Sequence, residues 1–311
     1  MIDLPVSSSQ PEPRPDGPLA EFAHLDTLWF QVAGTRCNLT CHHCFISCSP
    51  HNRNFEFLTY GQVEQGVQQG LKQGVREFYF TGGEPFLNPD IRAMLQLTLQ
   101  HGATTVLTNG TVMKPDWLQE LKAYQAESRY SLEFRVSIDG PTPERNDPIR
   151  GKGTFVRAMS GVEQLCEAGF LPIITMTRTW EDHEDQPILD AFRRTLAKHG
   201  CTRPRLKILP RLQIGAEAKR TQGYEQEDRV TELMMQGYDV TQLICHNSRV
   251  VTNKGVYVCP ILIDSPGARM GASVEESLEA FPLGYAACST CYQYGAICSN
   301  AATQSRQMTS S

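Results

Sequence analysis

Three cysteines lie within eight residues near the start of the chain, in the stretch GTRCNLTCHHCF. Cys37, Cys41 and Cys44 follow the spacing C-x3-C-x2-C. Three thiolates from one short loop can bind three irons of a [4Fe–4S] cluster, which normally takes four ligands. A structural zinc site is the alternative, since zinc takes cysteine and histidine, and His42 and His43 lie in the same loop. The spacing favours iron–sulfur and leaves one iron that needs a ligand from elsewhere.

A second group of cysteines follows late in the chain, in the stretches CHNSRVVTNKGVYVC and CSTCYQYGAIC. It consists of Cys245, Cys259, Cys288, Cys291 and Cys298. A C-x2-C pair together with further cysteines is typical of a metal site, and a zinc knuckle is the alternative to iron–sulfur here too. The polar surroundings argue against buried thiols that bind nothing. We therefore expect two metal sites that lie far apart in the sequence.

The composition excludes several classes of protein. The chain has 311 residues, 40% of them apolar and 20% charged, and a net charge of −5, which does not suggest nucleic acid as the main partner. No run of about 18 apolar residues could span a membrane, and the N-terminus lacks the pattern of a secretory signal. We expect a cytoplasmic protein, in which eleven cysteines indicate metal sites rather than a disulfide framework.

Strand-like and helix-like segments alternate between the cysteine groups. We expect strands at 27–33, 76–80, 104–108, 131–138, 172–177 and 205–209. We expect helices at about 59–74, 89–101, 115–125, 154–168 and 187–199. This alternation predicts a parallel α/β fold, either an open barrel or a doubly wound sheet. In such folds the chemistry gathers at the carboxyl ends of the strands, which is where the first cysteine loop begins.

Local signals refine these boundaries. Thr59 and Asn88 are suited to cap the amino ends of two helices, and Gly102 and Gly169 to end two helices. We expect loose tails at 1–24 and 301–311, a core domain at 25–215, and a small cysteine-rich domain at 216–300 with strand-like pieces at 248–253 and 255–259. The last domain has too little apolar material for a large core of its own, so a metal would supply much of its stability.

The chain resembles the radical S-adenosylmethionine (radical SAM) enzymes. The resemblance rests on C-x3-C-x2-C after the first strand, with the aromatic Phe45 behind it, and on Gly82-Gly83-Glu84-Pro85 after the second strand. In that family the GGE turn meets the amino group of SAM. Glycines permit a close backbone approach, and a carboxylate accepts hydrogen bonds from an ammonium group. The resemblance implies that SAM itself completes the coordination of the first cluster.

Two further residues resemble SAM contacts of the family, and a third could lie near the cofactor by its position. Ser137 in VSIDG and Arg150 in RNDPIRG correspond to the pair that grips the SAM carboxylate, for which arginine is suited because it can form two hydrogen bonds. Asn109 in LTNG closes the third strand and could face the cofactor. The alternatives are a strand-end cap for Ser137, a surface ion pair for Arg150, and a simple turn for Asn109.

The second cysteine group resembles the auxiliary-cluster region of the SPASM and twitch subgroup. The five cysteines fit the shorter twitch form, with one auxiliary [4Fe–4S] cluster on Cys245, Cys259, Cys288 and Cys291. Cys298 could replace one of these, stay free, or help hold an incomplete second cluster.

Three cysteines stand outside both groups of ligands. We expect Cys48 to be a spectator near the first loop and Cys166 to serve in packing on a helix face. Cys201 is ambiguous, with a hydrogen-atom donor as one possibility.

The resemblance implies a partial (βα)6 TIM-like barrel followed by the cysteine-rich domain. It also implies reductive cleavage of SAM to a 5′-deoxyadenosyl radical, which abstracts a hydrogen atom from the substrate. Only about 26 residues precede the first strand, which we take to favour net oxidation of a small molecule; modification of a ribosomally made peptide (cross-linking or epimerisation) is the alternative. A zinc- or iron-binding scaffold without turnover is a third hypothesis. The expected electron donor is a flavodoxin or ferredoxin, and Asp139 and Glu217 are acid–base candidates by location only.

Overall fold

The structure is a computed structural model that describes residues 15–225, 227–265, 267–295, 297, 298 and 300. Its main sheet has the strand order β10-β9-β8-β2-β3-β4-β5-β6-β7. Six neighbouring parallel strands follow the order of the chain: β2 (Thr27–Gln31), β3 (Glu77–Thr81), β4 (Ala103–Thr108), β5 (Leu132–Ser137), β6 (Ile173–Thr177) and β7 (Arg205–Leu209). The predicted strands and the partial (βα)6 barrel are confirmed.

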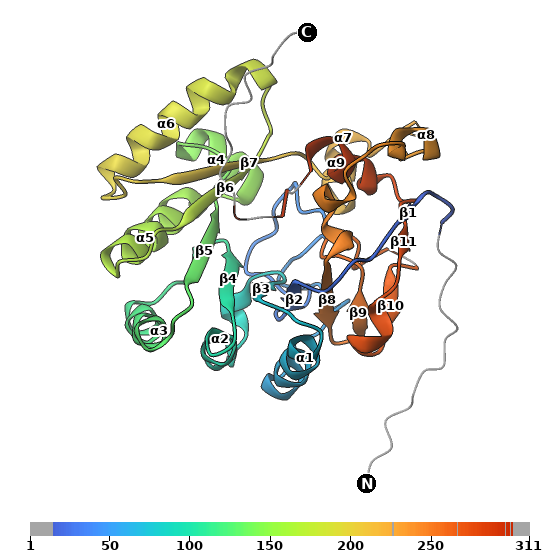
Figure 1. Cartoon of the computed structure of the whole chain (residues 1–311). Helices are drawn as coiled ribbons and strands as arrows, with labels where there is room; N and C mark the ends of the chain where they lie inside the picture. Colours follow the sequence, from blue (N-terminus) through green and yellow to red (C-terminus); the bar gives the residue numbers. More distant parts are fainter. Residues whose placement is uncertain (1–14, 226, 266, 296, 299, 301–311) are drawn as a thin grey trace.

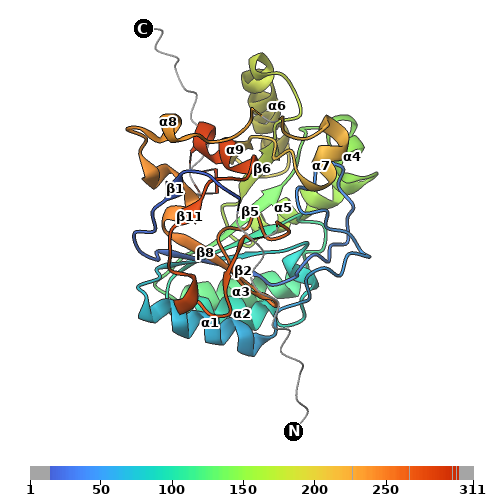
Figure 2. The same cartoon turned by 90° about the vertical axis from the view of Figure 1, so that its right-hand side faces the viewer.

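Helices cover the outer face of this sheet (Figure 1). The five predicted helices are α1 (Tyr60–Lys72), α2 (Ile91–Leu99), α3 (Pro115–Glu127), α5 (Thr154–Glu167) and α6 (Asp185–Lys198). In the view of Figure 2, α1, α2 and α3 form a layer below the strands. One further helix, α4 (Pro143–Arg150), was not predicted, because its interior Pro148 lacks an N–H for a helix hydrogen bond and hides the helical pattern.

Alternation along the strands gives the sheet two different faces. Phe30, Phe80 and Phe134 point outward and belong to one large apolar cluster with the helices. Trp29 and Tyr79 point to the inner face, where their rings stack with centroids 4.3 Å apart. Successive side chains of a strand point to opposite faces, so every second residue of β2–β7 faces the interior of the barrel.

The cysteine-rich region continues the barrel sheet. β8 (Ser248–Thr252) pairs in parallel with β2, and β9 (Gly255–Tyr257) and β10 (Arg269–Gly271) follow in antiparallel order. The predicted boundary at residue 215 is therefore no break in the sheet. The remaining elements of this region are short: α7 (Gly215–Thr221), α8 (Glu232–Met235), α9 (Ala287–Tyr294), and the 3-10 turns η3 (Val240–Gln242), η4 (Ile244–His246) and η5 (Glu275–Ser277).

The expected loose tail at 1–24 is wrong for its last part. β1 (Leu19–Ala20) pairs antiparallel with β11 (Phe281–Pro282), and the ring of Phe22 lies 4.3 Å from the buried guanidinium of Arg249. The segment thereby ties the start of the chain to the cysteine-rich region. Residues 1–14 and the predicted tail at 301–311 lie outside the described residues.

The two predicted helix caps have different outcomes. Thr59 caps α1 in a capping box with Gln62, as expected. Asn88 is not the cap of α2, which begins at Ile91 after Asp90. Instead the Asn88 side chain donates to the carbonyl oxygens of Val32 and Leu58, both at 2.8 Å, because its buried position lets it bridge two loops.

We expect Thr59→Ala to lower the free energy of unfolding by about 1 kcal/mol, because the variant loses the side-chain oxygen that accepts from the N–H of Gln62. Urea unfolding followed by far-UV circular dichroism measures the change. Thr59→Ser keeps the hydroxyl and serves as the control. Equal stability of the alanine variant and the native chain would contradict the role of the cap.

Cys166 and Cys201 are joined by a disulfide. Cys166 packs against the main core as predicted, but the sequence analysis did not expect it to be bonded. The possible role of Cys201 as a hydrogen-atom donor is wrong for this state, since its sulfur carries no hydrogen. Both residues precede the amino ends of β6 and β7, at the opposite edge from the first cysteine loop.

Candidate functional site

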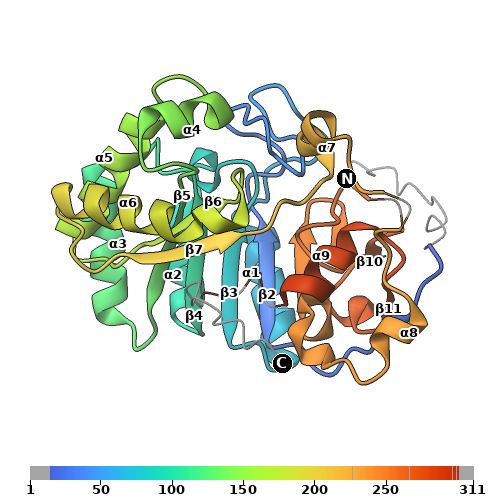
Figure 3. The same ribbon diagram turned by 90° about the horizontal axis from the view of Figure 1, so that it is seen from above.

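The first cysteine loop leaves β2 at the carboxyl edge of the sheet, and Figure 3 shows it between α4 and α7. Backbone hydrogen bonds hold it on both sides. The N–H of His42 donates to the carbonyl oxygen of Ile149 in α4 at 2.9 Å, and the N–H of Ala216 in α7 donates to that of Cys44 at 2.9 Å. The loop is thus fixed by elements that lie more than 100 residues away in the sequence.

The three thiols of this loop are free and differ in their surroundings. Burial raises the pKa of Cys37 to about 12 and that of Cys41 to about 11. A hydrogen bond from the Cys48 side chain lowers the pKa of Cys44 to about 6. A metal must displace the remaining protons, because the thiolate is the ligand. Cys48 therefore contacts the predicted ligand Cys44. That Cys48 does not itself bind the cluster stays a prediction.

The GGE turn lies directly against the cysteine loop. The N–H of Gly83 donates to the carbonyl oxygen of Gly34, and that of Glu84 to the carbonyl oxygen of Arg36, both at 3.0 Å. A Cβ on Gly83 would lie 1.9 Å from the Arg36 oxygen, and Gly82 has a φ of 141°. Glycine is thus required because the backbone of the turn lies directly against the loop that carries Cys37. This requirement is separate from the predicted close contact of the turn with SAM.

We expect Gly83→Ala to lower the free energy of unfolding by about 1–3 kcal/mol and to reduce the iron bound after reconstitution, because the new methyl group must displace the backbone next to Cys37. Gly61→Ala is the matched control, since no atom lies within 4 Å of its added Cβ. Iron analysis and thermal melting compare the two. An alanine at position 83 that binds iron like the control would contradict this role of the turn.

The Glu84 carboxylate is fully buried and braces the ends of two strands. It accepts hydrogen bonds from the N–H of Phe86 at 3.1 Å, the hydroxyl of Thr108 at 2.7 Å, and the N–H of Asn109 at 2.7 Å. Burial raises its pKa to about 7 despite these bonds. The contact of Glu84 with the SAM amino group stays a prediction. In the structure, the carboxylate also links the turn after β3 to the end of β4 through its hydrogen bonds.

Asn109 and Ser137 also lie at this edge. The Asn109 side-chain nitrogen lies 3.7 Å from the sulfur of Cys37 and donates to Asn38 at 2.9 Å. Ser137 ends β5, with its hydroxyl oxygen 3.3 Å from that of Thr175. The structure therefore brings both predicted SAM contacts to the side of the sheet that holds the cysteine loop.

Arg150 is buried at the end of α4 and bound to Asp139, so the surface ion pair considered as its alternative is wrong. Its Nε donates to Asp139 Oδ2 at 2.5 Å, and Nε2 of His43 lies 2.6 Å from the same oxygen. The other oxygen accepts the N–H of Thr177 at 2.7 Å. One carboxylate thus links the cysteine loop to the arginine predicted to grip SAM. The sequence analysis named Asp139 only by location and gave His43 no such role.

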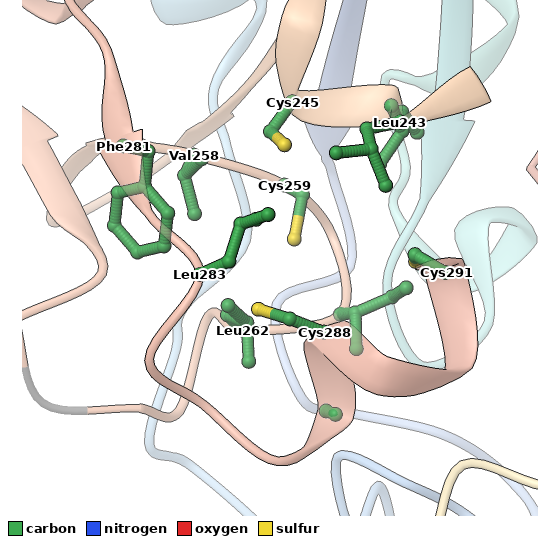
Figure 4. Close-up of a pocket in the computed structure, with 12 residues that line it drawn as sticks. Leu243, Cys245, Val258, Cys259, Leu262, Phe281, Leu283, Cys288 and Cys291 are labelled. Carbon is green, nitrogen blue, oxygen red and sulfur yellow. The ribbon is translucent and has the colours of Figure 1, made fainter. Parts of the chain in front are cut away.

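The four predicted auxiliary ligands share one pocket. Cys245, Cys259, Cys288 and Cys291 line it with apolar neighbours such as Leu262. Figure 4 shows the sulfur atoms of Cys245, Cys259 and Cys288 turned toward its interior, with Cys291 beside them on α9. Cys288 and Cys291 are three residues apart on that helix and so lie on one face.

The donor set of this pocket fits an iron–sulfur cluster. All four thiols are free and buried, and burial raises the pKa of each. For Cys259, Cys288 and Cys291, repulsion by neighbouring thiolates adds to the shift. Four thiolates from separate segments are the ligand set that a [4Fe–4S] cluster takes, and a zinc knuckle stays the alternative.

Cys298 and Glu217 do not line this pocket. Cys298 borders the inner side of the barrel near Trp29 and Tyr79, but it is still close to Cys291, because its charge is the foremost of the neighbouring thiolates that raise the pKa of Cys291. Glu217 is buried and forms two hydrogen bonds with Arg220, at 2.6 and 2.8 Å, which indicates a structural ion pair.

The profile of the radical SAM superfamily matches residues 32–192, slightly more than half of the chain. The chain belongs to the radical SAM superfamily. Members of this superfamily use SAM and a [4Fe–4S] cluster, and these are its cofactors. The similar proteins, together with the second cysteine pocket, assign it to the SPASM/twitch subgroup, whose members carry auxiliary clusters.

Several characterised proteins are similar in sequence. The mycofactocin maturase MftC of Mycolicibacterium smegmatis is 28% identical over 239 residues, covering 76% of this chain and 56% of the relative. The subtilosin biosynthesis protein AlbA of Bacillus subtilis is 29% identical over 155 residues, 48% of this chain and 33% of the relative. The AdoMet-dependent heme synthase of Methanosarcina barkeri is 32% identical over 144 residues, which cover 46% of this chain and 39% of the relative. The chain thus spans between a third and somewhat over a half of these relatives.

Solved structures support the fold. The structure of anSMEcpe with bound AdoMet has a TM-score of 0.59 at 20% identity, covering 81% of this chain and 77% of that one. Streptococcus suis SuiB bound to precursor peptide SuiA has a TM-score of 0.57 at 14% identity, covering 83% of this chain and 64% of that one. Among the described residues, no helix has the length and apolar character needed to cross a bilayer.

Proposed function

We propose that this radical SAM enzyme modifies a ribosomally made peptide. The observation that carries the proposal is the similarity to a protein named as a mycofactocin maturase, which covers 76% of the chain and therefore extends beyond residues 32–192. AlbA, named for bacteriocin biosynthesis, agrees with it. The expectation of a small-molecule substrate was based on the short segment before the first strand. The length of that segment is no longer an argument, because the chain covers only part of the length of its relatives.

The residues present suit the cofactors of the superfamily. Cys37, Cys41 and Cys44 would hold the first cluster, and Ser137 and Arg150 would bind the SAM carboxylate. When bound, the cluster and SAM supply the 5′-deoxyadenosyl radical that abstracts a hydrogen atom from the substrate. Four thiols from η4, the end of β9 and α9 would hold the auxiliary cluster, and we leave Cys298 out of this set because of its position.

The chain itself contributes orientation and exclusion of water. Asp139 holds Arg150 in place through the bond to Nε, which leaves the terminal guanidinium nitrogens as the donors for a carboxylate. The Asn109 amide beside the Cys37 sulfur can stabilise its negative charge. The stacked Trp29 and Tyr79 are buried on the inner face of the barrel, where apolar rings would help to exclude water from the interior.

The test uses the anaerobically reconstituted protein, which should bind about eight irons for two [4Fe–4S] clusters. Reduction with SAM should release 5′-deoxyadenosine. A short peptide encoded next to this gene, made with deuterated residues, should then transfer deuterium to 5′-deoxyadenosine and change in mass. Release of 5′-deoxyadenosine without deuterium transfer from any such peptide would contradict the peptide substrate. Iron-free protein with bound zinc would support the scaffold hypothesis instead.

Oxidation of a small molecule is the second candidate. It is favoured by the similarity to an AdoMet-dependent heme synthase at 32% identity. Deuterium transfer from a labelled small metabolite, with none from a peptide, would select it. In either case we propose a flavodoxin- or ferredoxin-type protein in the cytoplasm as the electron donor, which a reduction assay with purified donors can measure.

A further inference from the structure

The segment before β2 contacts two walls of the four-cysteine pocket. One wall is formed by β11 and the residue after it, and the side chains of Phe281 and Leu283 line the pocket there (Figure 4). The other wall is η4, which carries the proposed ligand Cys245. Residues 16–26, which we call the strap, are hydrogen-bonded to both walls.

On the side of β11, the backbones of the two segments approach each other closely. The N–H of Leu283 donates to the carbonyl oxygen of Pro18 at 2.9 Å, next to the pairing of β1 with β11. A Cβ on Gly17 would lie 2.7 Å from the backbone nitrogen of Gly284, and one on Gly284 would lie 2.5 Å from the carbonyl oxygen of Asp16. A side chain larger than hydrogen does not fit between these backbones, so the strap lies directly against the wall of the pocket.

On the side of η4, the strap holds the backbone of the turn that carries a ligand. The N–H of Ala23 donates to the carbonyl oxygen of His246 at 3.0 Å. The Nδ1 atom of His246 lies 3.1 Å from the carbonyl oxygen of Glu21. Because His246 directly follows Cys245, these two contacts fix the chain at the cysteine.

Between the two walls, the strap covers a buried arginine. Arg249 of β8 is fully buried, and its guanidinium donates to the carbonyl oxygen of Cys245 at 2.8 Å. It also donates to the carbonyl oxygens of Ser277 and Glu279, at 2.7 and 2.6 Å. The ring of Phe22 lies 4.3 Å from this guanidinium. The strap thus shields from water the hydrogen bonds that join η4 to the segment before β11, and such bonds are stronger in a dry interior.

The strap also belongs to the apolar surroundings of the four thiols. Ala20 is 1% exposed and lies in the same apolar cluster of buried residues as Cys245, Cys259, Cys288 and Cys291. The apolar shell around a metal site controls how far solvent reaches it. Removing the strap would therefore open this shell on the side of β11 and at η4 together.

We propose that residues 16–26 form a strap that closes the auxiliary-cluster pocket and keeps water and small oxidants from the cluster. The inference rests on the four-cysteine ligand set proposed above, and it is independent of whether the substrate is a peptide. Release of the strap is a local opening, because β8 stays paired with β2 while β11 and the turn at Cys245 lose their cover.

The first measurement is hydrogen–deuterium exchange of the reconstituted protein, native and Gly17→Ala. The added methyl group forces the strap and β11 apart. Exchange at the amide of Leu283, which donates to Pro18, should become about tenfold faster, because local opening governs exchange. Gly61→Ala is the matched control, since no described atom lies within 4 Å of its added Cβ, and it should leave this rate unchanged.

The second measurement is the decay of the two reduced clusters on mixing with aerated buffer, followed by electron paramagnetic resonance. The signal that does not respond to SAM reports the auxiliary cluster. In Gly17→Ala it should decay about tenfold faster than in the native protein, in proportion to the opening, while the SAM-responsive signal decays as before. Phe22→Leu, which removes the ring over Arg249 and leaves the backbone contact at Gly17 intact, should also speed the decay of the auxiliary signal.

Faster exchange at Leu283 without faster decay of the auxiliary signal would overturn the proposal, because the segment would then open without exposing the cluster. Equal acceleration of both signals would overturn it too, since that indicates a general loosening of the fold. Phe22→Leu carries the same comparison if Gly17→Ala does not fold. A native protein that binds only about four irons, all responsive to SAM, would refute the ligand set and the strap together and leave the peptide substrate untouched.

Discussion

Cys37→Ala is expected to remove about four of eight irons per chain and to abolish the release of 5′-deoxyadenosine. Cys37, Cys41 and Cys44 are free thiols of one loop that is fixed between α4 and α7 at the carboxyl edge of β2. Losing one ligand leaves the cluster with two, which does not hold it.

Iron analysis, visible absorption and electron paramagnetic resonance of the reduced protein measure this result. Two controls separate the sites. Cys288→Ala should lose the auxiliary cluster and keep the response of the first cluster's spectrum to SAM. Cys298→Ala should keep about eight irons, because Cys298 lies outside the four-cysteine pocket. If Cys298→Ala lost about four irons, the proposed ligand set would be wrong.

Asp139→Asn is expected to weaken SAM binding by about a hundredfold while the first cluster stays in place. The substitution keeps the size of the side chain, and its oxygen can still accept the N–H of Thr177. It removes the charge that faces both Arg150 and His43. Leaving one partner of a buried ion pair uncompensated costs about 3–5 kcal/mol. We expect part of this cost to weaken SAM binding, because Arg150 is then no longer held in the orientation that binds the SAM carboxylate.

The measurement is the dissociation constant of SAM, taken by calorimetry on protein of equal iron content, together with urea unfolding. Asp190→Asn is the matched control, since Asp190 is a partly exposed surface residue bonded to Arg193 and should change neither quantity. A variant at position 139 that loses its iron but binds SAM normally when loaded would show that Asp139 positions the cysteine loop instead of Arg150.

The pH dependence follows from the sign of the shift at Asp139. Burial by itself raises the pKa of this carboxyl, but Arg150 and His43 outweigh it and hold the pKa well below its usual value. A carboxyl with a lowered pKa in the folded state stabilises the protein above its unfolded pKa and loses that effect as the pH falls. The stability difference between the native chain and Asp139→Asn should therefore be constant above about pH 5 and shrink below about pH 4.

The helices, the strands and most of the candidate ligands are predictable from local sequence patterns. Strand and helix periodicity, the Thr59 cap and the cysteine spacings depend on residues that are near one another in the chain, so local chemistry suffices to predict them. The GGE turn is also recognised from adjacent residues, but its hydrogen bonds to Gly34 and Arg36 form only once β2 and β3 pair. Asn88 is not the cap of α2, because its side-chain oxygen accepts the N–H of Asp90 in the turn before the helix while its amide nitrogen bonds two other loops.

The tertiary structure alone decided which charged and sulfur-bearing groups meet. The contact of His43 with Asp139 joins residues about a hundred positions apart, on the loop after β2 and at the end of β5. The position of Cys298 outside its neighbours' pocket has the same origin. Such contacts depend on strand pairing and on how the sheet closes, which no pattern of nearby residues encodes.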